Sequence, residues 1–367
     1  MKFQYHVEYL NIEMKSAQII KIKEKLSIVD LPDPKPRDTQ VLVRIEASGV
    51  CHSDIHLWEG GYQGAAGTFL KVEDRGVKFP ITPGHEISGE IEAIGESVSG
   101  FSVGDRVVVY PWIGEGSCPA CRVAQENLCD TPKTIGIYRD GGYSELVLVP
   151  NFRYLVKIDN MDVNSSASLA CSGLTAFNAV KKAAVGPGES IVIIGAGGLG
   201  LMSVQIARAI TNSTIVVVDV DDKRLAEAKK LGAHEVVNSS KVDPVEDIKR
   251  LTNSLGTEAV IDFVNNNRTA PISINMLRKR GKLVMVGLFG GALELSLPVI
   301  PLRGFTITGA YTGSFNDLVE LVNLAKTGKI KSVVNRTYKL DDANQALDDL
   351  RAGKIVGRAV LNPNNKS

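Results

Sequence analysis

Hydrophobic and polar positions follow a strand-like pattern in the first third of the chain. From about residue 16 to 110, short runs such as VLVRIEAS, ISGEIEAIG and DRVVVYP alternate between apolar and polar positions, and turn signals such as PDPKP and PG separate them. Alternation with a period of two residues predicts strands that bury one face. We therefore expect an antiparallel, barrel-like domain in this part of the chain.

Between about residues 170 and 310 the pattern changes to an alternation of apolar strands and amphipathic helices. The strand SIVII leads into a glycine-rich turn, and the strands TIVVVDV, EVVN, EAVIDFV and KLVMVGL follow helical stretches, the last of which is expected to end in MLRKRG. This rhythm predicts a doubly wound parallel sheet, so the fold class is α/β. After about residue 312, two amphipathic helices and a closing strand, RAVLN, are predicted.

The composition is that of a globular protein with many turns. Of 367 residues, 44% are hydrophobic, 23% are charged and 35 are glycine, which excludes disorder, collagen and coiled coil. The net charge of +1 predicts no general attraction to nucleic acid or to a membrane surface. No apolar run reaches the roughly 18 residues of a membrane span, and the start of the chain lacks the apolar core of a secretory signal. We expect a cytoplasmic protein, in which residues 1–13 are a peripheral extension and Met14 is an alternative start.

A glycine-rich turn follows the first strand of the alternating region. The motif G-x-G-x-x-G is formed by Gly195, Gly197 and Gly200, and Gly198 and Leu199 lie within it. Between an apolar strand and a helix, this motif predicts a dinucleotide site, because the glycines permit a tight turn and a close approach of the pyrophosphate. The N-terminus of the next helix offers unpaired N–H groups to the phosphates. A turn of this kind that binds no ligand is the alternative.

Asp219 ends the strand TIVVVDV, nineteen residues after Gly200. A carboxylate at this place accepts hydrogen bonds from the ribose hydroxyls and repels a 2′-phosphate, so we expect NAD(H) as the cofactor. NADP(H) remains an alternative cofactor, because the side chain of Lys223 or Arg224 could approach a 2′-phosphate. Arg224 is counted with the cofactor-binding residues.

The five cysteines indicate metal sites. An odd number of cysteines does not describe a disulfide framework. Cys51 and Cys171 offer two thiolates, and His52, His56 and His85 each offer an imidazole. Two thiolates and one imidazole form the ligand set of a catalytic zinc that leaves its fourth position to water or substrate. Taken singly, such residues are more often packing cysteines or a solvated histidine, so the prediction depends on their joint occurrence. Asp54 and Glu86 are carboxylates suited to orient the histidine or to tune the metal.

A second metal site is predicted in a lobe at about residues 113–131. Cys118, Cys121 and Cys129 lie within twelve residues, and Glu115 precedes the first of them by three. Zinc accepts a carboxylate oxygen, so Glu115 is the expected fourth ligand of a closed structural site. With two cysteines at the catalytic site and three in the lobe, all five are used and each chain holds two zinc ions.

Taken together, the motifs resemble those of zinc-dependent medium-chain alcohol dehydrogenases, most closely the tetrameric archaeal NAD-dependent enzymes of thermoacidophiles. The likeness runs from about residue 15 to the C-terminus and includes GVCHSDIH, PGHE, LACSGLTAF, GAGGLG and VMVGLFG in this order. It implies a GroES-like catalytic domain over residues 1–170 and 312–367, and an NAD-binding Rossmann domain over residues 171–311. It also implies a homotetramer.

The resemblance implies catalytic roles at the cysteine and histidine motifs. The catalytic zinc ligands would be Cys51, His85 and Cys171. Glu86 resembles a carboxylate that approaches the metal in some states, and Ser53 and His56 resemble a relay that carries the alcohol proton to water. In the lobe, Glu115 replaces the first of four cysteines, as it does in some archaeal relatives, and we expect this harder ligand to weaken metal binding there.

The resemblance also implies contacts with the coenzyme and the substrate. His52 occupies a position that contacts the pyrophosphate, and Thr175, Gly287 and Leu288 border the nicotinamide ring. Trp112 lines the substrate pocket.

The implied reaction is the oxidation of primary and secondary alcohols to aldehydes and ketones, and its reverse, with hydride transfer to NAD. Two rivals belong to the same superfamily: polyol dehydrogenases, which typically have a carboxylate at the position of Cys171, and enoyl- or quinone-type reductases, many of which lack zinc ligands. A non-catalytic nucleotide-binding protein is a further alternative, because fold alone does not fix function.

Overall fold

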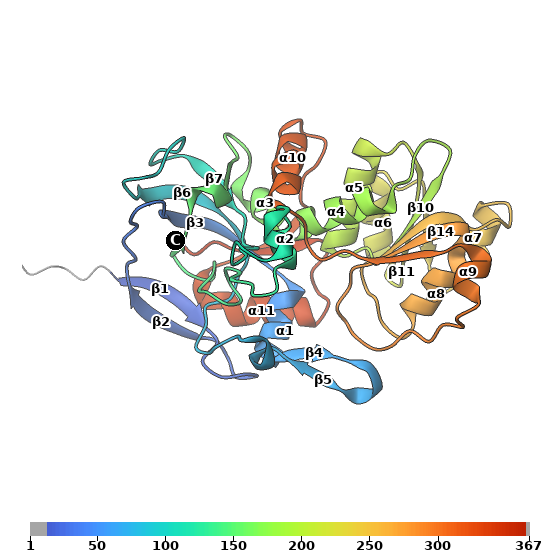
Figure 1. Cartoon of the computed structure of the whole chain (residues 1–367), viewed down its shortest axis with the longest axis horizontal. Coiled ribbons are helices and arrows are strands. Elements are labelled where there is room, and N and C mark those ends of the chain that lie inside the picture. Colours follow the sequence, from blue (N-terminus) through green and yellow to red (C-terminus); the bar gives the residue numbers. More distant parts are fainter. Residues whose placement is uncertain (1–12, 365–367) are drawn as a thin grey trace, which may run out of the picture.

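The computed structural model describes residues 13–364, so the predicted extension at residues 1–13 lies, except for its last residue, outside the described part. Two sheets form the two halves of the molecule, at the left and the right of Figure 1. The left sheet has seven strands: β3 (Val41–Val50), β6 (Glu86–Ile94), β7 (Arg106–Val109), β8 (Leu146–Val149), β9 (Leu155–Lys157), β16 (Val334–Tyr338) and β17 (Arg358–Leu361). Their order is β16-β17-β3-β6-β7-β9, β8 also pairs with β3, and only β16–β17 is parallel. The predicted antiparallel domain is confirmed.

The second sheet is six-stranded and wholly parallel, as predicted. Its order is β12-β11-β10-β13-β14-β15, so the chain reverses direction across the sheet at β10. In open sheets of this kind, ligands bind at the carboxyl ends of the strands where that reversal occurs. The strands are β10 (Ser190–Ile194), β11 (Thr214–Asp219), β12 (Glu235–Asn238), β13 (Thr257–Asp262), β14 (Leu277–Met285) and β15 (Thr306–Gly309).

Helices connect and cover these sheets. Those of the parallel half are α4 (Ser172–Ala183), α5 (Gly198–Ile210), α6 (Asp222–Lys230), α7 (Pro244–Leu251), α8 (Thr269–Met276) and α9 (Val299–Arg303). The remaining helices are α1 (His52–Glu59), α2 (Pro119–Arg122), α3 (Val163–Ala167), α10 (Phe315–Lys326) and α11 (Ala343–Arg351). Among residues 13–364, no helix is long and apolar enough to cross a bilayer. The domain boundaries at residues 170 and 312 stay predictions.

Two small hairpins extend the antiparallel half. Strands β1 (Glu13–Gln18) and β2 (Ser27–Pro32) pair with each other, and β4 (Gly61–Gln63) and β5 (Phe69–Lys71) form a hairpin at the lower edge of Figure 1. Helix α1 precedes this second hairpin and was missed by the all-β expectation for residues 16–110. Its start is stabilised by the carboxylate of Asp54, which accepts a hydrogen bond from the N–H of Cys51, and Gly60 ends it at a φ of 86°.

The predicted helix ending in MLRKRG is too long. Helix α8 stops at Met276, and β14 starts at Leu277, five residues before the predicted strand. Leu277 has an extended conformation and pairs with Thr257 of β13. Sheet pairing therefore outweighs the helical preference of the leucine, lysine and arginine residues in this segment.

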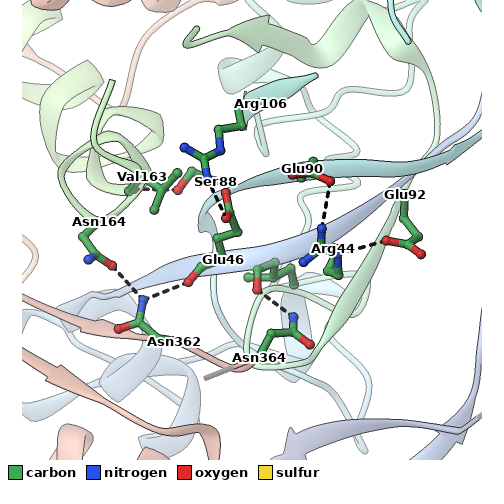
Figure 2. Close-up of polar contacts among 11 residues, drawn as sticks. Arg44, Glu46, Ser88, Glu90, Glu92, Arg106, Val163, Asn164, Asn362 and Asn364 are labelled. Atoms are coloured by element: carbon green, nitrogen blue, oxygen red, sulfur yellow. Dashed lines mark hydrogen bonds and ion pairs between the residues drawn. The ribbon is translucent and has the colours of Figure 1, made fainter. Parts of the chain in front are cut away.

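The C-terminal segment is fixed against β3 by side-chain amides, as Figure 2 shows. The amide of Asn362 donates to the carbonyl of Glu46 at 2.8 Å and to the Oδ1 of Asn164 at 2.7 Å. The amide of Asn364 donates to the carbonyl of Ile45 at 2.8 Å. These contacts hold β17 in register beside β3, so the start of β17 lies close to the end of β3.

Candidate active site

Three segments that are distant in sequence converge at the start of helix α1, strand β6 and helix α4. Cys51, His85 and Cys171 each directly precede one of these elements, and all three side chains are buried. Their ligand atoms lie within 4.8 Å of one another. The structure thus brings together the three residues that we predict to hold the catalytic zinc.

Asp54 holds this cluster in place. One oxygen of its carboxylate lies 3.2 Å from the Nδ1 of His85, and the carboxylate accepts hydrogen bonds from the N–H groups of Cys51 and Gly84 and from the hydroxyl of Tyr143. Among the described residues, neither ring nitrogen of the buried His85 has a hydrogen-bond partner, although the Nδ1 lies close to the carboxylate of Asp54. An orphaned imidazole nitrogen facing two thiols fits a zinc ion, and a carboxylate behind the other nitrogen is the usual support for such a ligand.

The electrostatic surroundings favour a thiolate at Cys51. A hydrogen bond with Cys171 lowers the pKa of Cys51 well below its usual value, and the charges of Arg358 and His85 lower it further against the effect of burial. Metals bind cysteine as the thiolate. The cluster is therefore prepared for a cation.

Arg358 lies beside this cluster and was not predicted from the sequence. Its guanidinium pairs with the carboxylate of Glu86, and its Nη2 lies 3.8 Å from the Sγ of Cys51. Burial raises the pKa of Glu86 to about 7, and the charge of Arg358 opposes this rise. The two partners are 272 positions apart, so no local sequence pattern could join them. The approach of Glu86 to the metal stays a prediction.

A cavity opens directly beside the cluster. It is bounded by residues of both halves of the molecule, including all those predicted to touch the substrate or nicotinamide or to relay the proton: Ser53, His56, Trp112, Thr175, Gly287 and Leu288. Sequence reasoning missed other residues of its wall, among them Phe263, Phe289 and Tyr311. These come from loops after strands β13, β14 and β15, where no periodic pattern marks which side chain faces a cavity.

Trp112 forms one wall of this cavity in a fixed orientation. Its Nε1 donates to the carbonyl of Ala170 at 2.9 Å, and its ring lies 5.4 Å from that of His85. On the other side, the ring of Tyr311 packs edge-on against it at 5.6 Å. Two aromatic rings that pack against each other therefore form part of the cavity wall next to the cluster.

His56 is held as a neutral base at the edge of the cavity. Its ring lies 4.8 Å from that of Tyr62, and its Nδ1 lies 3.9 Å from a carboxylate oxygen of Glu59. Burial lowers the pKa of His56, and the charge of Glu59 only partly offsets this effect. At neutral pH the imidazole can therefore accept a proton.

The predicted dinucleotide motif borders a second cavity. This groove is lined by His52, Gly195, Gly197, Gly198, Leu199, Gly200, Asp219, Arg224 and Arg358, among others. It shares His52, Leu199, Phe263 and Phe289 with the cavity beside the cluster, so the two cavities adjoin. The carboxyl end of β10 thus faces a groove that adjoins the cavity beside the candidate metal ligands.

The glycines and Asp219 shape this groove. A Cβ at Gly200 would lie 1.8 Å from the carbonyl oxygen of Gly195, whose own φ is 93°, so both positions require glycine. The carboxylate of Asp219 accepts hydrogen bonds from the N–H groups of Ala196 at 2.6 Å and Val220 at 2.7 Å. Asp219 therefore stabilises the glycine-rich turn and also lines the groove.

A second cluster forms in the predicted lobe. Glu115, Cys118, Cys121 and Cys129 place their ligand atoms within 4.8 Å of one another around the short helix α2. The lobe also contacts the wall of the active-site cavity, because the amide of Asn127 donates to the carbonyl of Tyr311 at 2.7 Å. The predicted structural-zinc ligands are thus brought together, and the lobe touches the substrate side of the molecule.

Fold and site together define a zinc-binding dehydrogenase with a catalytic half and a dinucleotide-binding half. Residues 37–160 match the family model of the alcohol dehydrogenase GroES-like domain, and residues 198–327 match that of the zinc-binding dehydrogenases. The chain belongs to the zinc-binding alcohol dehydrogenase family.

Relatives over the full chain support this assignment. The chain is 46% identical to the NAD-dependent alcohol dehydrogenase of Sulfurisphaera tokodaii and 44% identical to that of Saccharolobus solfataricus, in each case over 95% of this chain and 100% of the relative. Among solved structures, the alcohol dehydrogenase of Aeropyrum pernix superposes with a TM-score of 0.87 at 34% identity and covers 95% of this chain and 100% of its own.

Proposed function

We propose that this protein is an NAD-dependent alcohol dehydrogenase that oxidises primary and secondary alcohols to aldehydes and ketones and catalyses the reverse reaction. The observation that carries the proposal is the convergence of buried Cys51, His85 and Cys171 on a cavity that adjoins the dinucleotide groove. The similar archaeal enzymes are named as NAD-dependent alcohol dehydrogenases, which supports both the substrate class and the coenzyme.

Cys51, His85 and Cys171 are the residues for the catalytic zinc, whose chemistry when bound is that of a Lewis acid that lowers the pKa of an alcohol hydroxyl. The groove is the site for NAD, which supplies the hydride acceptor. Glu115, Cys118, Cys121 and Cys129 are the residues for a second zinc with a structural role.

The side chains of the protein transfer the proton, bind the coenzyme and orient the substrate. The hydroxyl of Ser53 accepts the proton of the substrate hydroxyl, and the neutral imidazole of His56 passes it toward solvent. Asp219 accepts hydrogen bonds from the ribose hydroxyls, and His52 contacts the pyrophosphate. Trp112 orients the substrate, while Thr175, Gly287 and Leu288 hold the nicotinamide ring against it.

The direct test is NADH formation from a panel of primary and secondary alcohols, measured together with zinc content. Cys51→Ala should lose turnover and about one zinc per chain. Cys121→Ala is the matched control, because it also removes one thiol ligand, and it should lose zinc from the lobe while retaining measurable turnover. Full activity of Cys51→Ala without zinc would refute the metal role.

Cys171 separates this proposal from its rivals. A thiol rather than a carboxylate at this position disfavours a polyol dehydrogenase, and a complete ligand set disfavours a zinc-free reductase.

A homotetramer and a cytoplasmic location complete the proposal, and sedimentation of the purified protein tests the oligomeric state.

A further inference from the structure

Two further cavities adjoin the active-site cavity, and the side chain of Tyr311 lines all three. The first lies between the β4–β5 hairpin and the loop after β14, and the second lies between that hairpin and the predicted zinc lobe. Tyr62 and Arg75 line both of them, and Tyr311 lines both and the active-site cavity as well. A substrate that extends past Tyr311 would therefore enter a region that is lined by Tyr62 and Arg75.

This region is rich in unused hydrogen-bond donors. Within residues 13–364, the guanidinium of Arg75 forms no ion pair or hydrogen bond, and the hydroxyls of Tyr62, Tyr138 and Tyr311 form no hydrogen bond. Four potential donors thus line the second cavity without a protein acceptor. Arg75 is exposed, so the guanidinium is reachable from solvent and through the cavities.

Arg75 is the single residue among lysine, arginine, aspartate and glutamate that lines these two cavities in the described part of the chain. Among the described residues, neither cavity is lined by an aspartate or a glutamate. Burial raises the pKa of Tyr62 and of Tyr311, so their hydroxyls stay protonated at neutral pH, although the positive charge of Arg75 lowers both pKa values. One cation and three neutral donors, with no carboxylate in the lining of either cavity, are suited to bind an anion.

The path toward this region is largely apolar. Leu70, Met285, Leu288 and Leu293 line the first cavity, and Leu288 also borders the active-site cavity. A methylene chain fits such walls, whereas a densely hydroxylated chain would leave its polar groups unpaired. Arg75 therefore lines the same cavity as these apolar side chains, and that cavity shares Leu288 and Tyr311 with the active-site cavity.

We propose that Arg75, with Tyr62, Tyr138 and Tyr311, forms an outer subsite that binds a carboxylate at the far end of the substrate. A guanidinium pairs well with a carboxylate because its N–H groups match the two oxygens. The inference rests on the proposed function and specifies its substrate class as ω-hydroxy acids, with ω-oxo acids in the reverse direction. In that reaction the carbinol carbon loses a hydride to NAD and its hydroxyl loses a proton, while the carboxylate is unchanged.

Paired substrates test the preference. Specificity constants, kcat/KM, are measured for ω-hydroxy acids from 3-hydroxypropanoate to 8-hydroxyoctanoate and for the 1-alkanols of equal carbon number. We expect the acid-to-alkanol ratio to exceed one at a preferred chain length. In Arg75→Gln this ratio should fall by about tenfold, the effect of losing one charged hydrogen bond, and Arg75→Lys should restore part of it.

Two variants provide controls. Arg250→Gln removes an equal charge from an exposed position on helix α7 and should keep the wild-type ratio. Tyr138→Phe removes only a hydroxyl and should lower the ratio less than Arg75→Gln. A ratio at or below one for every chain length, or equal ratios in Arg75→Gln and Arg250→Gln, would overturn the subsite.

A binding measurement separates this inference from the proposed function. Hexanoate has a carboxylate but no hydroxyl, so it cannot be oxidised. Its titration into the protein in the presence of NAD, followed by calorimetry, therefore measures carboxylate binding without turnover. Binding that weakens about tenfold in Arg75→Gln supports the subsite even if no alcohol is oxidised, in which case the proposed function alone fails. Binding that is unaffected by Arg75→Gln, or no binding to the wild type, overturns the subsite even if 1-alkanols are oxidised.

Discussion

The guanidinium of Arg358 and the carboxylate of Glu86 form an ion pair that is almost completely enclosed, with 3% and 0% of the two side chains exposed. Arg358 also borders the dinucleotide groove and approaches the thiol of Cys51. One side chain therefore contacts both the candidate metal cluster and the candidate coenzyme site.

Breaking this pair should destabilise the fold. Arg358→Met leaves the carboxylate of Glu86 buried without its partner, and we expect the free energy of unfolding to fall by about 3–5 kcal/mol, measured by denaturant titration. The double variant with Glu86→Gln removes both charges and should recover a large part of this loss. A double variant that is less stable than Arg358→Met would contradict the account.

Asp54 should control metal affinity through His85. In Asp54→Asn the imidazole loses the carboxylate behind its Nδ1, and we expect zinc affinity at the buried cluster to fall by about 10- to 100-fold in a chelator competition. Tyr143→Phe removes only a hydroxyl that donates to Asp54 and should have a smaller effect. Unchanged affinity in Asp54→Asn would show that the histidine needs no such support.

The pH dependence of alcohol oxidation should follow His56. Only the neutral imidazole accepts a proton, so activity is present above its pKa and is lost as the pH falls through it. Glu59 raises this pKa, and Glu59→Gln should therefore move the acid limb of the kcat/KM profile to lower pH. Glu73→Gln, at an exposed position after β5, is the control. A limb that stays in place, or moves to higher pH, would argue against the relay.

Asp219 should select the coenzyme. Asp219→Gly removes a negative charge from the groove, and we expect the ratio of NADP-linked to NAD-linked kcat/KM to rise. The NAD-linked activity itself should fall, because the N–H groups of Ala196 and Val220 lose their acceptor. Asp222→Asn removes a charge that pairs with Lys241 on the surface and should leave the ratio as it is. An unchanged ratio in Asp219→Gly would refute the selector role.

Much of the fold could be predicted because its signals are local. The β12 strand EVVN matches its predicted limits, and β10 to β13 and the helices between them occur in the predicted order, although α7 ends at Leu251, before the end of the predicted helix. Helix α1 was missed because two histidines and an aspartate interrupt its apolar face, and its packing against α11 involves a segment near the other end of the chain. The start of β14 was misplaced because pairing with β13 decides it.

The candidate metal ligands could be predicted because their chemistry is restrictive. Few residue types bind zinc, so the cysteines and the histidines stand out in the sequence, and the resemblance selects His85 over His52 and His56 as the third ligand. Nothing in the sequence singles out Arg358 in this way, because most arginines in proteins lie on the surface. Its partner is known only once β17 lies beside β3.

Metal removal with recovery tests the central claim most directly. The purified protein is analysed for zinc, stripped with a chelator and reloaded, and NAD-linked alcohol oxidation is measured at each stage. The two clusters predict about two zinc ions per chain, loss of turnover when the Cys51, His85 and Cys171 cluster is emptied, and recovery when zinc is returned. Full turnover by protein that contains no metal would contradict the account.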